Sequence, residues 1–479
     1  MDASLLATAT FPDADRAHWL KLAQRAIGDA DFDAALVSAT DDGVRIEPLY
    51  DRVRNPKPVM RDHPDTAWTV VQRVDDPDPA RANAQALDDL ANGATGLSVI
   101  FEGAPNAFGY GLPATPEALA RALDGISFAT THIRIDVHPS VRASVDWLTP
   151  LIGARRIDPS RLKLSLGIDP AALFAGTGRL RMSVEALQAS MPQSLAHFFA
   201  LGMPGVLLEA DGRVYHNAGA TEAQELGAML ATAVAHLRMF QEARQPLVYA
   251  APHVGFALSV DQDQMIGMAK LRALRKLWAR VQEACSIAPS AASIHAETSY
   301  RMMTAKDPET NILRATIACF AAVTGGADSI SILPFTAAHG LPDGFARRVA
   351  RNTQAVLGGE SHIGYVADPA AGSGGVEALT DALCAKAWAE FQAIEAEGGI
   401  MASLAEGRLQ ARIGAARQAR LAAYADGARA IVGTTLYPAG TERPISTLAA
   451  ETRPMPDDGA VFCEALFPSR LDASSGAAA

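Results

Sequence analysis

The chain has few cysteines and few basic residues for its size. It contains 4 cysteines in 479 residues, far apart and without a C-x-x-C pair. This spacing excludes a zinc ribbon and a disulfide scaffold, and it indicates a reducing, cytoplasmic setting. Lysine and arginine number 42 against 53 acidic residues, which gives a formal net charge of −11. Nucleic-acid binding normally requires a basic face, so we expect no nucleic-acid partner.

Long apolar runs are lacking too. No stretch approaches the roughly 20 apolar residues that a membrane helix needs. The N-terminus, Met-Asp-Ala-Ser, has no basic region before an apolar stretch. We therefore expect neither a membrane span nor a signal peptide. The composition is that of an ordinary globular protein, with 49% hydrophobic and 20% charged residues, and it offers ample material for a core.

Short β-rich runs alternate with helix-length segments from residue 94 onward. This alternation predicts a parallel α/β sheet, and eight such units in about 280 residues match a (β/α)8 TIM barrel. A doubly wound open sheet is the alternative. The weakest, eighth candidate strand is 179–184, and the clear ones are 96–102, 132–138, 162–168, 205–210, 247–253, 291–297 and 328–333.

Polar residues interleave with apolar ones in several of these runs. Fully buried parallel strands usually read as continuous apolar stretches. In a closed barrel the apolar set faces the helices and the polar set faces the lumen. We therefore place Arg134, Asp136 and Lys163 in the lumen, which indicates either a ligand channel or an ionic plug, and we favour the plug because buried charges need partners.

The remaining segments flank this barrel. Residues 13–28 predict an amphipathic helix, and we divide the chain into an N-terminal helix and arm (1–65), a barrel (66–375), C-terminal helices (376–437) and an extended or disordered tail (438–479). The C-terminal helices should break at Gly398 and Gly399. We expect the arm to contact a partner subunit; packing on its own domain is the equal alternative.

Several stretches resemble the catalytic barrel of methylmalonyl-CoA mutase, in order and spacing over roughly residues 66–437. The most specific is Phe-Ala-Arg-Arg-Val-Ala-Arg-Asn-Thr-Gln at 345–354. The others are Trp68-Thr69 with Gln72, Gly96 to Val99, Ala269 to Ala273 with Leu277 to Ala279, His295 with Thr298-Ser299, and Asp368-Pro369 with Gly372-Ser373 and Val376-Glu377.

The comparison with this family also shows that several of its motif residues are replaced in this chain. The family motif R-P-W-T-I-R-Q-Y reads Thr66 to Arg73 here, without either arginine or the tyrosine. The family's P-R-L-S-F-F reads Pro252 to Ala257, and R-T-H-S-Q-T-S reads Ser293 to Ser299, so two more arginines are replaced. The D-x-H-x-x-G motif that ligates cobalt in the family is not found, and we expect no cobalamin-binding domain, no bound cofactor and no metal site in this chain.

Two histidines are candidates for remnants of a catalytic site. The family's G-Y-H aligns without a gap on Gly212-Arg213-Val214, whereas a two-residue gap places Tyr215-His216 there. His295 should lie at the carboxyl end of a strand, where barrel active sites lie. The plain alternatives are a loop histidine and a core histidine. The three arginines Arg347, Arg348 and Arg351 either meet a partner's carboxylates or, as we favour, form a solvated face.

We therefore predict a small, non-catalytic subunit of a heterodimeric, adenosylcobalamin-dependent methylmalonyl-CoA mutase. The homologous large subunit would bind the cofactor and the acyl-CoA, the complex would interconvert methylmalonyl-CoA and succinyl-CoA, and the isolated chain would be inactive. The alternative is the acyl-CoA-binding barrel half of a split mutase that works with a separate cobalamin-domain protein. A stand-alone barrel with different chemistry is a third hypothesis, for which no catalytic set is evident.

Overall fold

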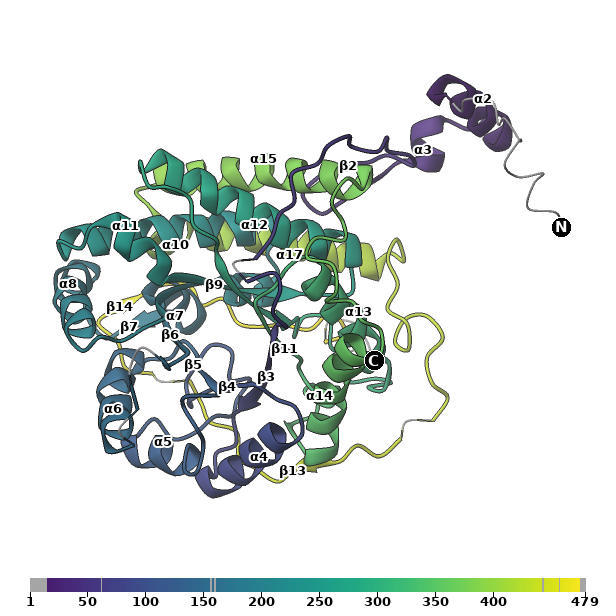
Figure 1. Cartoon of the computed structure of the whole chain (residues 1–479). Helices are drawn as coiled ribbons and strands as arrows, with labels where there is room; N and C mark the ends of the chain where they lie inside the picture. Colours follow the sequence, from purple (N-terminus) through teal and green to yellow (C-terminus); the bar gives the residue numbers. More distant parts are fainter. Residues whose placement is uncertain are drawn as a thin grey trace, which may run out of the picture.

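A computed structural model describes residues 15–473 except 62, 156, 159, 160, 442 and 456. Eight parallel strands close into a barrel in chain order, with the last strand paired to the first. Figure 1 shows helices surrounding them. The strands are β3 (Thr69–Val74), β4 (Gly96–Val99), β5 (His132–Ile135), β6 (Leu164–Ile168), β8 (Val206–Asp211), β9 (Val254–Val260), β10 (Ser293–Thr298) and β11 (Ser329–Ser331). The predicted (β/α)8 barrel is confirmed.

Two strand predictions are wrong. Residues 247–253 form a short helix, α11 (Leu247–Ala250), and a 3-10 turn, η2 (Ala251–His253), and the barrel strand begins one residue later. Of residues 179–184 only β7 (Arg179–Leu180) is extended, and it pairs outside the barrel with the tail strand β14 (Val461–Phe462). The true remaining barrel strand is β3, whose buried Gln72 and Arg73 hide its strand character.

The outer helices follow the strands and cover them. Their starts are set by side-chain caps such as Asp78, Asp263 and Asp343, whose carboxylates accept backbone N–H groups of the first turn. The outer helices are α4 (Pro79–Ala91), α5 (Pro116–Ala122), α6 (Val141–Ala154), α7 (Pro170–Thr177), α8 (Val184–Ala200), α10 (Glu222–Glu242), α12 (Gln264–Ala284), α13 (Thr310–Thr324) and α14 (Gly344–Gly359). The short helix α9 (Arg213–Ala218) directly follows β8 and is entirely buried. No helix in the described ranges is both long and apolar enough to span a membrane.

The first C-terminal helix lies against α10 and α12, and the C-terminal helices break where the sequence predicts. They are α15 (Gly374–Ala396), α16 (Ile400–Ala405) and α17 (Arg408–Ala425). Gly398 and Gly399 have φ values of 99° and 90°, a left-handed backbone that glycine adopts at little cost. The glycine pair therefore ends α15 and turns the chain into α16.

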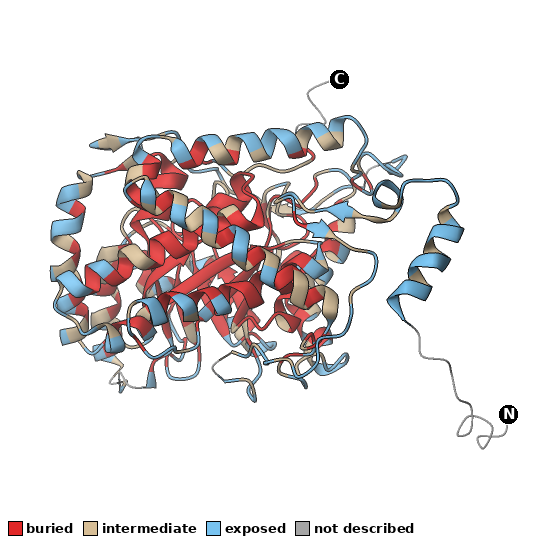
Figure 2. Cartoon of the chain, turned by 90° about the horizontal axis from the view of Figure 1, so that it is seen from above, coloured by how far each residue is buried: buried red, intermediate tan, exposed pale blue. Residues whose placement is uncertain are grey.

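The N-terminal region is divided between two environments. Helices α2 (Arg16–Ile27) and α3 (Phe32–Leu36) project from the barrel, and no residue of either helix is buried (Figures 1 and 2). The following hairpin, β1 (Ser38–Ala39) and β2 (Arg45–Ile46), packs on the chain's own helices. There Asp41 pairs with Arg420 of α17 at 2.7 Å.

The tail past residue 437 is extended and crosses the molecule. Strand β13 (Thr447–Leu448) pairs with β12 (Leu341–Pro342), and β14 pairs with β7. Residues 460–472, which we call the tail strap, bond through backbone N–H groups to carbonyls of Gly178, Ala175, Asn217 and Arg301. Because these acceptors follow β6, β8 and β10, the strap lies at the carboxyl end of the barrel.

Candidate functional site at the carboxyl end of the barrel

The barrel lumen is filled by charged side chains. The lumen cluster consists of Arg73, Asp75, Arg134, Asp136, Glu209, Asp211, Arg213 and Glu297, and every member is buried. At its centre the Arg213 guanidinium, on the first residue of α9, donates to Asp211 at 2.6 Å and to Glu297 at 3.3 Å, and it also pairs with Asp136. One guanidinium therefore joins carboxylates from β8, from β10 and from the residue that follows β5.

Two more arginines complete the lumen cluster. Arg134 of β5 pairs with both carboxylate oxygens of Glu209. Arg73 of β3 donates to Glu297 at 2.8 Å and to Asp75 at 3.0 Å. Such bidentate, charge-assisted bonds are the arrangement that makes a buried ion pair tolerable. The polar lumen is thus an ionic plug and not an open channel.

The charges of the lumen cluster depend on one another. Burial alone would raise the pKa of Asp136, but Arg213 and Arg134 lower it to about 2. The pKa of Asp75 is likewise lowered to about 2, because Arg347 and Arg73 outweigh its burial. Both aspartates are therefore ionised at neutral pH, and the placement of Arg134 and Asp136 in the lumen is confirmed. Lys163 is exposed before β6 begins, so its placement in the lumen is wrong.

The carboxyl mouth of the barrel is covered as well as filled. The ring of Phe108 stacks on Tyr300 with centroids 4.2 Å apart, and the Arg73 guanidinium lies 5.2 Å from the Phe108 ring centre. The tail strap runs across the same end, where the Arg470 guanidinium contacts the Tyr300 hydroxyl at 3.4 Å. A ligand would have to displace these groups to enter the barrel from this end.

His216 lies beside this mouth in a fully buried polar group. Its Nε2 is 3.0 Å from the Ser299 hydroxyl, and its Nδ1 is 3.0 Å from a carboxylate oxygen of Glu225 on α10. This is the order of groups found in a serine nucleophile with its base and orienting acid. Ser299, however, has no exposed surface. No substrate reaches its hydroxyl in this arrangement, which therefore acts as a polar brace between α9, α10 and the end of β10.

The same group resembles a metal site in composition. His216, Glu222 and Glu225 place ligand atoms within 4.8 Å of one another. The Lys270 ammonium of α12 lies 2.7 Å from Glu225, 4.0 Å from Glu222 and 3.4 Å from His216 Nδ1. Lys270 therefore already supplies the cation that these carboxylates require, and a metal ion would have to displace it.

The Glu225 carboxyl should make stability depend on pH. Burial raises its pKa to about 7 although Lys270 acts in the opposite direction, against about 4.3 in an unfolded chain. A raised pKa of this kind stabilises the folded state fully below the unfolded pKa, and the gain is lost as pH rises through about 7. Glu225→Gln should therefore destabilise the chain more at pH 5 than at pH 8, measured by urea unfolding at both values. An equal loss at both pH values would contradict this expectation; Asp124→Asn, at an exposed carboxylate, is the matched control.

The other predicted histidine lies deeper. His295 is the third residue of β10, in the middle of the strand rather than at its carboxyl end, which corrects the predicted position. Its Nδ1 is 2.9 Å from the Ser329 hydroxyl, and its Nε2 has no partner in the described part of the chain. Burial, together with Arg134 and Arg213, lowers the pKa of His295 well below its ordinary value, so the ring is neutral at pH 7. Val214 is buried outside the lumen, near Gly176.

The arginines of the 345–354 motif have structural partners. Arg347 donates to Asp75 at 2.7 Å and so supports the lumen cluster from outside, and Arg351 pairs with Asp89 of α4. Only Arg348 is exposed. The favoured prediction of a solvated face is therefore wrong for two of the three, because their partners lie more than 250 residues away in sequence.

The family model described as methylmalonyl-CoA mutase matches residues 37–457. The chain belongs to the methylmalonyl-CoA mutase family. It is 37% identical to the methylmalonyl-CoA mutase small subunit of Streptomyces virginiae, over 95% of this chain and 75% of that protein. The small subunit of Propionibacterium freudenreichii subsp. shermanii is 32% identical over 87% of this chain and 65% of its own length.

A probable small subunit of Mycobacterium tuberculosis is 41% identical over 60% of this chain and 47% of that protein. The chain thus spans three quarters of one of these relatives and about half to two thirds of the others. Within the mutase family it is of the small-subunit type, as the predicted resemblance indicates.

Membership of the mutase family implies an adenosylcobalamin-dependent complex. The residues described in this chain do not fit that group or an acyl-CoA. The lumen cluster fills the barrel, and the tail strap covers its carboxyl end. Three of the replaced family arginines correspond to Thr66, His253 and Ser293. Thr66 and His253 lie just before β3 and β9, and Ser293 is the first residue of β10. The His253 ring bonds the Gly205 carbonyl of its own chain at 2.6 Å. No reaction step through the cofactor follows from these side chains.

Proposed function

We propose that this chain is the non-catalytic subunit of a heterodimeric methylmalonyl-CoA mutase. A homologous large subunit binds adenosylcobalamin and the acyl-CoA, and the complex interconverts methylmalonyl-CoA and succinyl-CoA. The isolated chain is inactive. Its contribution is a stable barrel that holds the partner in its working geometry.

One observation carries this proposal. At the position of the family's tyrosine the chain has Arg73, and at the position of the family's glutamine it has Glu297. The two replacements meet in the lumen as an ion pair of 2.8 Å. A third replacement, Arg213 at the tyrosine of G-Y-H in the ungapped alignment, binds the same Glu297. Positions of the family motifs have thus been exchanged for mutually complementary charges that fill the space.

The expected loss of acyl-CoA affinity also supports a non-catalytic chain. Four cationic positions of the family motifs carry Thr66, Val71, His253 and Ser293 here. A hydrogen bond to a charged group contributes about 1.5–3 kcal/mol, so these losses together remove several decades of acyl-CoA affinity. The split-mutase alternative needs an acyl-CoA-binding barrel, and no contact in the described residues favours it.

The projecting N-terminal segment supports a partner contact. Trp19 of α2 and Phe32 of α3 pack edge to face with ring centroids 6.4 Å apart, while Leu20 and Leu22 are 39% and 50% exposed. An amphipathic helix normally buries its apolar face, but no residue of this one is buried within the described chain. We assign residues 16–36 to the interface with the large subunit.

The test is co-expression with the large subunit of a methylmalonyl-CoA mutase. We expect a 1:1 complex with mutase activity, and a chain that alone neither turns over methylmalonyl-CoA with added coenzyme nor binds it by calorimetry. Replacing Trp19 and Leu22 together by aspartate should weaken the complex at least about tenfold without changing the unfolding midpoint of the isolated chain, since neither residue is buried.

A matched control is Leu87→Asp, at another exposed leucine on α4, which should leave the complex intact. Micromolar binding of an acyl-CoA by the isolated chain would overturn the non-catalytic assignment and favour the split-mutase alternative. A chain that remains alone in the presence of the large subunit would overturn the heterodimer.

A further inference from the structure

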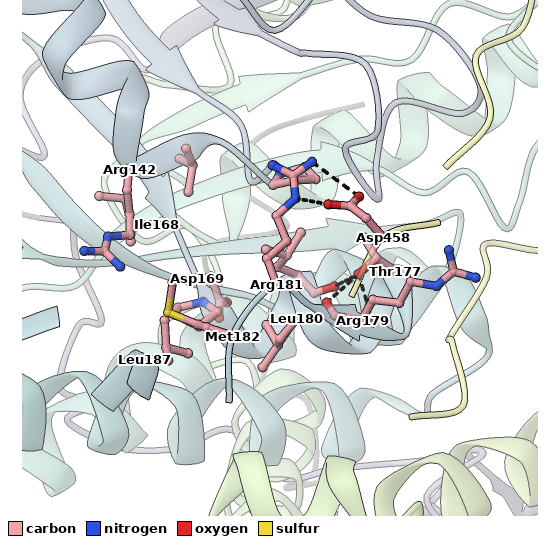
Figure 3. Close-up of a pocket in the computed structure, with 14 residues that line it drawn as sticks. Arg142, Ile168, Asp169, Thr177, Arg179, Leu180, Arg181, Met182, Leu187 and Asp458 are labelled. Atoms are coloured by element: carbon pink, nitrogen blue, oxygen red, sulfur yellow. Dashed lines mark hydrogen bonds and ion pairs between the residues drawn. The ribbon is translucent and has the colours of Figure 1, made fainter. Parts of the chain in front are cut away.

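An apolar pocket lies outside the lumen, between the carboxyl ends of β5 and β6 and helices α6 and α8 (Figure 3). Its cavity volume is about 100 Å³. The wall is formed mainly by aliphatic side chains: Val141, Ile168, Leu173, Leu180, Met182 and Leu187. Neither the lumen cluster nor the His216 group contributes a side chain to this wall, so the pocket is separate from the site described above.

The tail builds one side of this pocket. Strand β14 pairs with β7, and the Ala460 N–H donates to the Leu180 carbonyl at 2.7 Å. Just before it, Asp458 pairs with Arg181 at 2.7 Å, and Figure 3 shows this pair beside Leu180. The cavity is therefore assembled from segments about 280 residues apart in sequence and is not a gap within a single loop.

A half-buried cation without an anionic partner lies in the pocket wall. The Arg142 guanidinium donates to the hydroxyls of Ser190 at 3.1 Å and of Ser194. Within the described ranges no carboxylate comes within 4 Å of it, and partial burial lowers its pKa. Among the described residues two of its five N–H donors have acceptors, so a ligand oxygen can accept from the others.

The one buried carboxyl in the wall does not oppose an anion. Asp169 accepts backbone N–H bonds from Ala171 and Ala172 at 2.9 Å and from Asp211 at 2.8 Å. Burial raises the pKa of Asp169 to about 8, so this group is largely neutral at pH 7. The charge presented to the cavity is therefore positive.

We propose that this pocket binds a short-chain aliphatic carboxylate, with the chain among the aliphatic side chains and the carboxylate on Arg142. A dry aliphatic cavity of about 150 Å³ holds benzene, so the smaller cavity here suits about four carbon atoms. Arginine recognises a carboxylate through two parallel N–H bonds, which explains why an arginine with only hydroxyl partners lies beside an apolar cavity. The site is independent of the proposed subunit role.

Calorimetric titration of the whole chain with straight-chain carboxylates from butanoate to octanoate tests this site. Affinity should rise about fourfold per added methylene until the cavity is filled, and should then level off. The alcohols of the same length lack the charge and should bind at least about tenfold more weakly. In crystals soaked with 4-bromobutanoate, the bromine should lie next to Leu173 and Leu187.

Two variants test the assignment independently. Arg142→Gln should weaken hexanoate at least about tenfold, whereas Arg121→Gln, at an exposed arginine of α5, should not. Met182→Trp fills the cavity from a side chain that is 37% exposed and should abolish binding even if Arg142→Gln fails to fold. The proposal would be overturned if hexanoate and hexanol bound with equal affinity, or if Met182→Trp bound hexanoate as tightly as the unchanged chain does. It would also be overturned if no carboxylate of any length gave a heat of binding, or if the bromine of 4-bromobutanoate lay elsewhere in the crystal.

Discussion

Replacing Arg213 by alanine should destabilise the chain by about 3–5 kcal/mol, the usual loss when one partner of a buried ion pair is removed. The guanidinium is completely buried and contacts Asp136, Asp211 and Glu297. Without it three carboxylates from separate parts of the barrel face one another inside a closed lumen. The measurement is the midpoint of urea unfolding at pH 7, followed by tryptophan fluorescence.

Acid should reduce this difference. The pKa of Asp136 is about 2 in the folded chain and about 3.9 in an unfolded one, so its ion pairs stabilise the fold above pH 3.9 and are lost as pH falls towards 2. Arg121→Ala, which removes an exposed pair with Asp124, is the control and should stay within about 0.5 kcal/mol of the unchanged chain. A loss below about 1 kcal/mol for Arg213→Ala would mean that the lumen cluster does not stabilise the barrel.

Restoring the family residues at 73 and 297 together should be far less harmful than restoring either one alone. Arg73→Tyr removes the cation 2.8 Å from Glu297 and should destabilise the chain by about 3–5 kcal/mol. Glu297→Gln leaves Arg73 with Asp75 alone. In the double variant both charges are gone, and we expect a coupling of at least about 1.5 kcal/mol between the two changes, measured by a double-mutant cycle of urea unfolding.

Arg73→Tyr combined with Glu242→Gln is the matched comparison, because Glu242 lies at the end of α10, outside the lumen. That pair should be additive within about 0.5 kcal/mol. Additivity of Arg73→Tyr with Glu297→Gln would remove the main support for regarding the two replacements as mutually compensating.

The barrel itself could be predicted because its strands are short, β-rich and regularly spaced. Ile133 and Ile135 alternate with Arg134, and the outward apolar and inward polar sides follow from this alternation alone. The errors arose where local preference misleads. Residues 247–253 are rich in β-formers, yet Pro246 and Pro252 suit the starts of the short helix and the 3-10 turn. Strand β3 is hard to recognise from the sequence because the buried polar residues Gln72 and Arg73 break its apolar pattern.

The partners within the site could not be predicted from the sequence. Glu297 meets Arg73 across 224 residues, and Ser299 meets His216 across 83. Only barrel closure brings such residues together, and no periodicity in one sequence reports it. The sequence shows which family residues are replaced. Only the three-dimensional structure shows that two of the replacements form an ion pair. Only the composition of the tail indicates its structure in the sequence, and that composition predicts an extended or disordered chain without predicting the tail strap.

The tail strap also has a consequence for the order in which parts of the fold form during synthesis. Chains emerge from the ribosome N-terminus first, and contacts within the emerged part form first. Strands β3 to β11 can close while residues 460–472 are still inside the exit tunnel, so a nascent barrel has an uncovered mouth and an incomplete wall at Leu180. The barrel without the tail strap is therefore the form with an accessible lumen entrance, and the strap covers that entrance only after the barrel has closed.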